Sequence, residues 1–175
     1  MNRDKTKSVL GRDNWYYFTE NYVDYPVPVT LKDMYINNCV YKTADNGIVY
    51  RLAGDASYEI VKYKGNAASV TIPDTYNEKP VTAILPEVFK DNQTMTSVTI
   101  GINITTIGAN AFENCDGLTS VSLPNAVTFV GEDAFVDCDE LTSFHIGTRF
   151  KDHDGNFLAY CPKLTTITVA DGNTN

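Results

Sequence analysis

Three of the four cysteines recur at a fixed interval, and this spacing limits the chemistry that they could perform. Cys115, Cys138 and Cys161 lie 23 residues apart, whereas Cys39 stands alone. If equivalent positions stack, their Cα atoms lie about 5 Å apart, which a disulfide tolerates. Parallel Cβ vectors and an odd number of stacked thiols nevertheless disfavour a bridge. Zinc sites use closer spacings such as C-x-x-C, which the sequence lacks. We interpret the three as a column of small, buried, apolar side chains.

The sequence shows no catalytic or metal-binding arrangement. Catalysis by a thiol requires a nearby base and exposure of the sulfur, and neither His145 nor His153 is placed by sequence against a cysteine of the column. The segment "DHDGN" (152–156) begins like a calcium loop, but Leu158 and Tyr160 occupy the region where an acidic ligand is needed. No nucleophile accompanied by a base and an orienting acid is evident. We therefore predict a protein without enzymatic activity, cofactor or metal.

The elements that position these residues are internal repeats with the same period of 23 residues. "AFENCDGLTSVSL" begins at residue 111 and "AFVDCDELTSFHI" at residue 134, with Phe, Cys and Leu at matching places. The first unit carries five extra residues around "TYNEKP", which we interpret as a turn. The predicted units span residues 67–94, 95–117, 118–140, 141–163 and, in part, 164–175.

Each unit alternates apolar and polar residues as a half-buried strand does. In "LTSVSL", Leu118, Val121 and Leu123 face inward while Ser120 and Ser122 face outward. A Pro or Gly follows, then a short apolar stretch, then a segment such as "GEDAFVDC" that we expect to form one helical turn. Because one unit cannot bury its apolar side alone, the units must stack, which predicts a solenoid with parallel strands. In the third complete unit, "FKDHDGN" places His153 where Ile107 and Val130 stand, so we expect the chain to leave the regular coil there and form an exposed loop.

The repeated phrases "IGANAFENC" and "VGEDAFVDC", together with the apolar strand positions, resemble the BspA-like leucine-rich repeats over about residues 67–175. The resemblance implies a right-handed leucine-rich-repeat solenoid of short parallel strands and single helical turns, behind a β-rich N-terminal cap. It also implies a bacterial cell-surface or secreted module that binds proteins in adhesion. The repeats of that family are not catalytic.

The outward strand positions form the first candidate binding surface. Nine of the ten are serine or threonine, and none is the Trp, Tyr or Arg that usually anchors an interface. Such a face suits either a broad, weakly held protein partner or no partner at all. The candidate partner-binding residues are Ser97, Thr99, Ser120, Ser122, Ser143, His145, Thr166 and Thr168.

The charge distribution gives a second candidate surface. The chain has 22 acidic and 14 basic residues, and the segment 91–148 contains eight of the acids but no lysine or arginine. Stacking should align several of these acids along one edge, where they could either maintain solubility or attract a basic protein surface. The net charge of −8 disfavours nucleic acid as a partner. The candidate acidic edge consists of Glu113, Asp116, Asp137, Asp139 and Glu140.

The N-terminal 46 residues have a different composition from the repeats. "NWYYFTENYVDYPVPV" (14–29) is rich in aromatic residues, and we expect residues 1–46 to contribute to a cap over the first coil, with residues 47–66 forming a β-hairpin. "TLKDMYINN" (30–38) could form a short helix capped by Thr30. An alternative is that the aromatic segment binds carbohydrate.

The sequence as a whole predicts a non-enzymatic protein-interaction or adhesion module of a bacterial surface or secreted protein. The alternative to a binding role is a structural spacer that displays another domain. No apolar run reaches the roughly 18 residues of a membrane span, and the start of the chain lacks the apolar core of a signal peptide. Leu164, Ile167 and Val169 begin a coil that has no apparent cover, which predicts end-to-end self-association.

Overall fold

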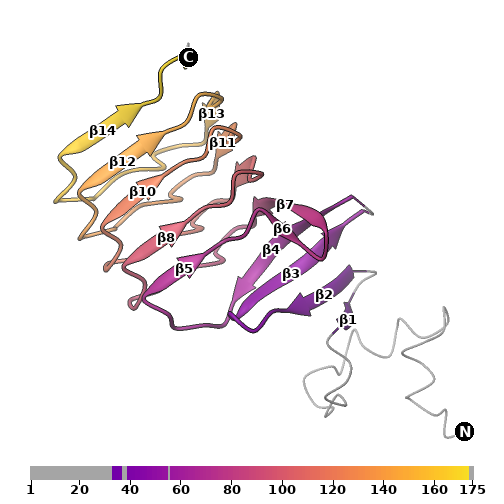
Figure 1. Ribbon diagram of the computed structural model, residues 1–175. Helices are drawn as coiled ribbons and strands as arrows, with labels where there is room; N and C mark the ends of the chain where they lie inside the picture. Colours follow the sequence, from indigo (N-terminus) through magenta and orange to yellow (C-terminus); the bar gives the residue numbers. More distant parts are fainter. Residues whose placement is uncertain (1–32, 37–38, 55, 174–175) are drawn as a thin grey trace, which may run out of the picture.

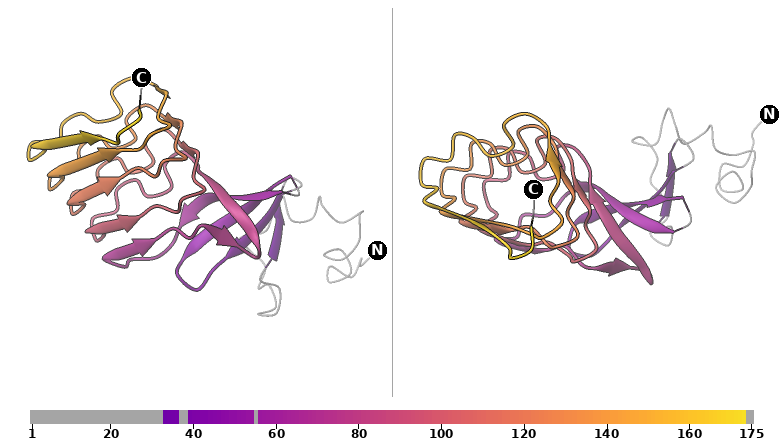
Figure 2. Two further views of the ribbon diagram at one scale, coloured as in Figure 1. Left: turned by 45° about the horizontal axis from the view of Figure 1, so that its top comes forward. Right: turned by 90° about the horizontal axis from the view of Figure 1, so that it is seen from above.

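The computed structural model describes residues 33–36, 39–54 and 56–173, with side chains from residue 41 onward. From residue 69 the chain winds into a solenoid whose successive coils lie side by side (Figure 1). Viewed from above, the coils superpose as nested loops (Figure 2). The predicted solenoid with an N-terminal β-rich cap is thereby confirmed.

The cap is an antiparallel sheet made of four strands. They are β1 (Asp33–Ile36), β2 (Cys39–Thr43), β3 (Ile48–Ala53) and β4 (Ser57–Tyr63). The expected short helix over residues 30–38 is wrong, because residues 33–36 form β1 and pair with β2. The aromatic stretch from Trp15 to Tyr25 lies outside the described residues.

The cap and the repeats share one sheet. The last cap strand, β4, pairs in parallel with β7 (Lys79–Ile84), and the ladder continues through β9 (Thr106–Ile107), β11 (Phe129–Val130) and β13 (Asp152–His153). The five extra residues of the first unit form a short hairpin in which β6 (Thr75–Tyr76) pairs with β7. Because β4 aligns Ile60 with Ile84, the cap presents the first coil with a matching edge strand.

A second row of strands forms the other long side of the solenoid. Its members are β5 (Ser69–Thr71), β8 (Ser97–Thr99), β10 (Ser120–Ser122), β12 (Ser143–Ile146) and β14 (Thr166–Val169). The pairs β5–β8, β10–β12 and β12–β14 are parallel and in register at intervals of 28 or 23 residues. The five strands lie side by side in Figure 1.

The expected single helical turn is absent, because the described residues contain no helix. In its place, Asn110, Asn114, Asp133 and Asp137 adopt left-handed φ angles of 55–57°, a conformation that Asn and Asp tolerate better than most residues. The N–H groups of Asn110, Phe112 and Asn114 donate to carbonyl oxygens of the next unit at 2.8–2.9 Å. The backbone groups that would close a helical turn are therefore used between coils.

The interior consists of columns of equivalent residues. Phe89, Phe112 and Phe135 are buried and stack face to face, with ring centroids 4.9 and 5.0 Å apart. Gly131 lies where coils approach closely: a Cβ there would come 2.5 Å from the backbone nitrogen of Ala109. One unit thus supplies the packing surface for the next.

The segment "FKDHDGN" follows the coil more closely than its sequence predicts. Its β13 pairs with β11 in register, with His153 aligned to Val130, so the expectation that the chain leaves the coil here is wrong. The expected exposure is present, since residues 151–156 are all exposed. Backbone hydrogen bonds, such as Asp154 N to Val130 O at 3.1 Å, keep the register although the side chains are polar.

Candidate interaction surfaces

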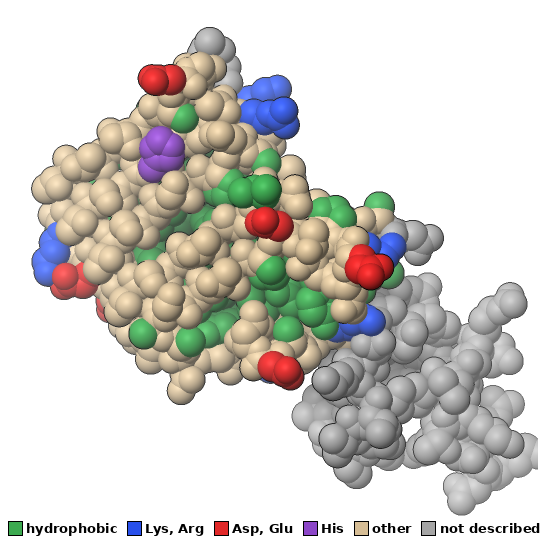
Figure 3. All heavy atoms as spheres, viewed as in Figure 1, with side chains coloured by type: hydrophobic (Ala, Val, Ile, Leu, Met, Phe, Trp, Pro, Cys, Tyr) green, Lys and Arg blue, Asp and Glu red, His purple; other side chains and the backbone are tan. Residues whose placement is uncertain are grey.

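The outward side chains of the β5, β8, β10, β12 and β14 row form a continuous surface, here called the strand face. Parallel pairing sets Ser69 beside Ser97, Ser120 beside Ser143, and Ser143 beside Thr166. The outward positions are exposed, apart from Ser143 and His145, which are half-buried. In Figure 3 the viewed side is mainly tan, with green hydrophobic patches between the tan areas, few charged atoms and one purple imidazole. The structure therefore gathers the predicted hydroxyl-bearing residues on one neutral face.

His145 is held by its neighbour on the strand face. Its Nδ1 lies 2.8 Å from the Oγ1 of Thr168, 23 residues later on β14. The contact fixes the imidazole against the sheet. Whether Nδ1 donates or accepts in this hydrogen bond depends on the tautomer of the ring. Among the described residues, the hydrogen bond of this ring goes to Thr168, not to a cysteine or a carboxylate. His145 thus forms part of the strand face.

Sequence reasoning missed a threonine ladder beside the strand face. Thr119 Oγ1 donates to Thr96 O at 3.3 Å, Thr142 Oγ1 to Thr119 O at 3.0 Å, and Thr165 Oγ1 to Thr142 O at 3.3 Å. The signal was present as the recurrent second residue of "MTS", "LTS" and "LTT". Each hydroxyl ties one coil to the preceding coil, so these threonines have a structural role between coils.

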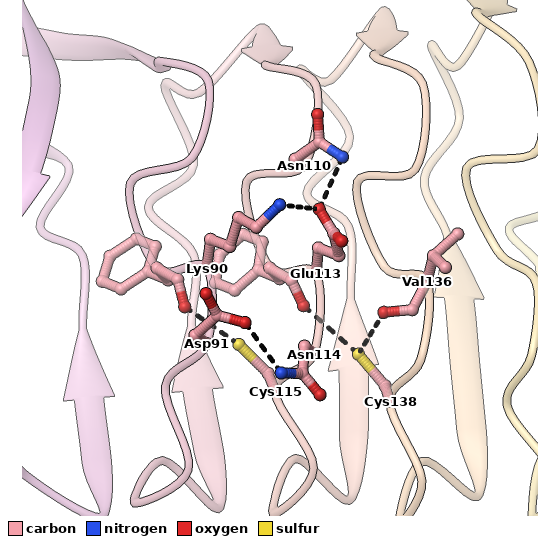
Figure 4. A network of polar contacts seen from close by, with 10 residues as sticks. Lys90, Asp91, Asn110, Glu113, Asn114, Cys115, Val136 and Cys138 are labelled. Carbon is pink, nitrogen blue, oxygen red and sulfur yellow. Dashed lines mark hydrogen bonds and ion pairs between the residues drawn. The ribbon is translucent and has the colours of Figure 1, made fainter.

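Two of the predicted acidic-edge residues are neutralised by lysines of a neighbouring unit. The Glu113 carboxylate lies 2.7 Å from Lys90 Nζ and accepts a hydrogen bond of 2.6 Å from Asn110 (Figure 4). The Glu140 carboxylate lies 2.5 Å from Lys163 Nζ. Both pairs join residues 23 positions apart, so they cross-link adjacent coils, and the Glu113 contact raises the pKa of the Lys90 ammonium group.

The remaining acidic-edge residues keep their negative charge uncompensated. Asp137 and Asp139 are exposed and Asp116 is half-buried. Among the described residues, none of the three forms an ion pair with a lysine or arginine. The uncompensated negative charge of the edge therefore lies in the units 95–117 and 118–140.

The cysteine column is buried at Cys115 and Cys138, as its spacing predicts, but Cys161 is half-buried. All three are free thiols. Each thiol donates to the carbonyl oxygen of a phenylalanine in the preceding unit, as in Cys115 Sγ to Phe89 O at 3.2 Å. Burial raises the pKa of Cys115 to about 12. The hydrogen bond with Cys161, together with burial, also raises the pKa of Cys138. Cys115 and Cys138 are therefore poor nucleophiles at neutral pH, whereas the hydrogen bond with Cys138 lowers the pKa of the half-buried Cys161 to about 7.

Among the residues that the structure describes, metal-ligating side chains do not converge. No group of three or more His, Cys, Asp or Glu side chains that could hold an ion occurs in the described ranges. In the "DHDGN" segment, the Asp152 carboxylate accepts the backbone N–H of His153 at 2.9 Å. The His153 ring packs 5.0 Å from Phe157, between ring centroids. The geometry of this segment gives no support to a calcium loop.

A family model described as "BspA type Leucine rich repeat region" matches six copies over residues 59–175. This match covers more than half of the sequence. The chain belongs to the BspA-type leucine-rich repeat family. The match begins within β4, in agreement with the parallel pairing of β4 and β7. Members of leucine-rich repeat families are generally non-enzymatic, and a repeat module of the protein-interaction or adhesion type is supported.

Solved structures confirm the fold of this BspA-type chain. A leucine-rich repeat protein from Bacteroides capillosus is 24% identical, with a TM-score of 0.65 over 73% of this chain and 96% of its own. A leucine-rich cell surface protein from Faecalibacterium prausnitzii is 26% identical, with a TM-score of 0.55 over 87% and 45%. The pneumococcal vaccine antigen PcpA is 19% identical, with a TM-score of 0.67 over 78% and 33%. The chain thus spans less than half of the last two proteins.

Two further comparisons bear on this BspA-type chain. No curated protein matches it. In the described part of the chain, no helix has the length and hydropathy needed to cross a membrane.

Proposed function

We propose that this chain is a protein-binding module of a bacterial cell-surface or secreted protein, and that it binds through the strand face. The observation that carries the proposal is the alignment of outward hydroxyls within the pair β5–β8 and within the trio β10–β12–β14. A solenoid face of this kind offers an extended area to a partner. Because nine of its ten outward side chains are serine or threonine and the tenth is His145, the face offers a flat partner a largely uncharged surface. Similarity to proteins described as a cell surface protein and a vaccine antigen favours this location.

We further propose that the acidic edge selects for a partner with a basic surface. Asp116, Asp137 and Asp139 leave uncompensated charge next to the neutral strand face. A partner that contacts both surfaces would gain association rate from the edge and contact area from the face.

Substitutions that add bulk and charge to the strand face would test the binding role. Wild-type chain and the variants Ser120→Arg and Ser122→Arg would be immobilised and incubated with detergent-free surface-protein extracts of bacterial and animal cells. Thr75→Arg is the matched control, because Thr75 is an exposed hydroxyl residue on β6, away from the strand face. We expect both serine variants to lose proteins that the wild type and Thr75→Arg retain. If all four retain the same proteins, the strand face is not the binding surface, and the spacer hypothesis is favoured.

A further inference from the structure

A pocket lies between the cap and the first coil of the solenoid. Its volume is about 390 Å³, and it is lined by Tyr63, Gly65 and Asn66 on the cap side and by residues 88–94 on the coil side. The pocket follows from the shorter path that the chain takes in the cap. Twelve residues, 85–96, join β7 to β8, whereas only five, 64–68, join β4 to β5. Between β4 and β5, the described chain therefore offers no counterpart that covers residues 88–94 as the second coil does from the other side.

Two peptide groups of the first coil direct their carbonyl oxygens toward the cap. The N–H groups of Phe89 and Asp91 donate to carbonyl oxygens of the second coil at 2.8 and 2.9 Å. Because the C=O and N–H of a trans peptide group point in opposite directions, the carbonyl oxygens of Val88 and Lys90 point away from the second coil. No hydrogen bond from the described residues reaches these two oxygens. The coil side of the pocket is thus a row of hydrogen-bond acceptors.

The side chains on the coil side add further acceptors and one uncompensated charge. Asp91 accepts a hydrogen bond of 2.7 Å from Asn114 Nδ2 (Figure 4), and it forms no ion pair with a lysine or arginine of the described residues. Lys90 Nζ lies 2.7 Å from the Glu113 carboxylate, so the positive charge of this lysine is already compensated. Gln93 donates its Nε2 to Asn114 O at 2.7 Å, which leaves its Oε1 as an acceptor. The pocket therefore favours a ligand that is cationic and rich in donors.

Tyr63 supplies an aromatic wall on the cap side. Its half-buried ring lies 5.1 Å from that of Phe89, between centroids. The Tyr63 hydroxyl accepts the N–H of Ala67 at 3.2 Å, which holds the far end of the side chain. A Cβ at Gly65 would come 2.5 Å from Tyr63 Cζ, so the glycine makes room for the ring in this position. A fixed aromatic ring is a surface on which a cation can stack.

We propose that this pocket binds the guanidinium group of an arginine side chain in a protein partner. A guanidinium has five N–H donors, no acceptor and a permanent positive charge, which suits the carbonyl oxygens of Val88 and Lys90 together with the Asp91 carboxylate. Its plane can also stack on Tyr63, which the ammonium group of a lysine does less well. An extended peptide backbone fits poorly, because it presents C=O as well as N–H groups along its edge. The inference rests on the basic partner proposed above, and it names the side chain that such a partner inserts.

Titration of the full chain with N-acetyl-arginine amide, followed by ¹H–¹⁵N NMR, tests the site directly. We expect saturable shifts in the amide signals of Gly65, Asn66 and residues 89–94. N-acetyl-lysine amide should bind more weakly, because its three donors radiate from one point. N-acetyl-citrulline amide has nearly the same shape without the charge, and it should not bind measurably.

Asp91→Asn is the diagnostic variant. Asparagine tolerates the φ of 60° at this position and keeps an oxygen for the hydrogen bond from Asn114, so the fold is retained. We expect the affinity for the arginine derivative to fall by about two- to fivefold at low salt, the effect of losing one exposed ion pair. Asp137→Asn is the matched control, because Asp137 has a φ of 55° in the equivalent position two units later and does not line the pocket. Its affinity should equal that of the wild type.

The outcomes separate this proposal from the two on which the binding role rests. The absence of saturable shifts at the pocket, or equal affinity for the lysine or citrulline derivative, would overturn the assignment of a guanidinium site. An equal loss of affinity in Asp91→Asn and Asp137→Asn would also overturn it, and would assign the arginine to the acidic edge instead. If Ser120→Arg and Ser122→Arg retained all proteins, the strand face would be refuted while these titrations stayed unaffected.

Discussion

The ring of Phe112 lies over that of Phe135, with centroids 5.0 Å apart and planes inclined by 6°. Both side chains are fully buried, and 23 residues of chain separate them. The same stacking joins Phe89 to Phe112 at 4.9 Å and 11°. The sequence period thus becomes a continuous column of aromatic rings, and each coil depends on its neighbours for the burial of its own ring.

Removal of one ring from the middle of this column should destabilise the whole array. Phe112→Ala is expected to lower the free energy of unfolding by about 3–5 kcal/mol, because it leaves a cavity between two buried rings. Urea denaturation followed by circular dichroism would measure the loss. Ile102→Ala is the control, since a side chain that is 66% exposed should change stability by only about 0.5 kcal/mol or less. Equal losses in the two variants would contradict the role of the column.

The repeats could be predicted because apolar residues, Phe and Cys recur at the same positions of successive units. The inward Val121 and the thiol of Cys138 lie in columns at the places that the 23-residue period indicates. The acidic edge was only partly visible in the sequence. The ion pair between Lys90 and Glu113 depends on the alignment of neighbouring coils. Lys90 directly precedes the segment 91–148, which has no lysine or arginine, so the sequence alone did not indicate that Glu113 is paired.

The conformation of the segment after each second strand could not be predicted from the sequence. "GEDAFVDC" has small and aromatic residues at helical spacing, but the left-handed Asp133 and Asp137 interrupt any helix. Neighbouring coils offer carbonyl oxygens to its N–H groups, for example Phe157 O to Phe135 N–H at 2.8 Å. Tertiary hydrogen bonds therefore override local helix propensity here, and propensity alone carries no information about them.

One left-handed position in the last complete unit, residues 141–163, carries an unfavourable residue. Tyr160 has a φ of 53° and continues the column of Asp91, Asn114 and Asp137. Because its side chain is 79% exposed, its removal costs little burial. We expect Tyr160→Asn to stabilise the protein by about 1 kcal/mol, since Asn tolerates this conformation better. Tyr160→Ala removes the same ring, but alanine does not tolerate left-handed φ angles as asparagine does. An equal increase in stability in Tyr160→Ala would show that backbone strain is not the cause. Thermal unfolding of the three proteins would measure the difference.

The buried thiol of Cys115 should make stability decline at alkaline pH. Its pKa is raised from 9.0 to about 12 in the folded protein, chiefly by burial. The unfolded chain therefore releases this proton as the pH rises above 9, while the folded chain retains it until near pH 12. The stabilisation is fully present below pH 9 and is lost as the pH rises, with a slope of about 1.4 kcal/mol per pH unit.

A Cys115→Ala variant isolates this contribution. The substitution lowers stability at neutral pH through lost packing, but it removes the titrating group. The difference in unfolding free energy between wild type and variant should therefore shrink from pH 9 to pH 11. Tyr50, whose pKa burial also raises to about 12, is present in both proteins and cancels. Urea unfolding at each pH would measure the difference, and a gap that stays constant would contradict the assignment.

The uncompensated acids should govern binding of a basic ligand. Asp137 and Asp139 are exposed, and no lysine or arginine of the described residues pairs with them. We expect Asp137→Asn with Asp139→Asn to weaken binding of a lysine-rich peptide by about two- to thirtyfold at low salt, because each of the two exposed ion pairs is worth about 0.2–1 kcal/mol. Asp45→Asn with Glu78→Gln makes the same change in net charge at exposed positions of the cap and of the β6–β7 hairpin. This control should bind almost as the wild type does.

Fluorescence anisotropy at 20 and 300 mM salt would measure the affinities, which should fall at the higher salt because exposed charges are screened. Equal weakening in both double variants would show that only the net charge of −8 matters, and affinity independent of salt would show that the edge does not act through its charge.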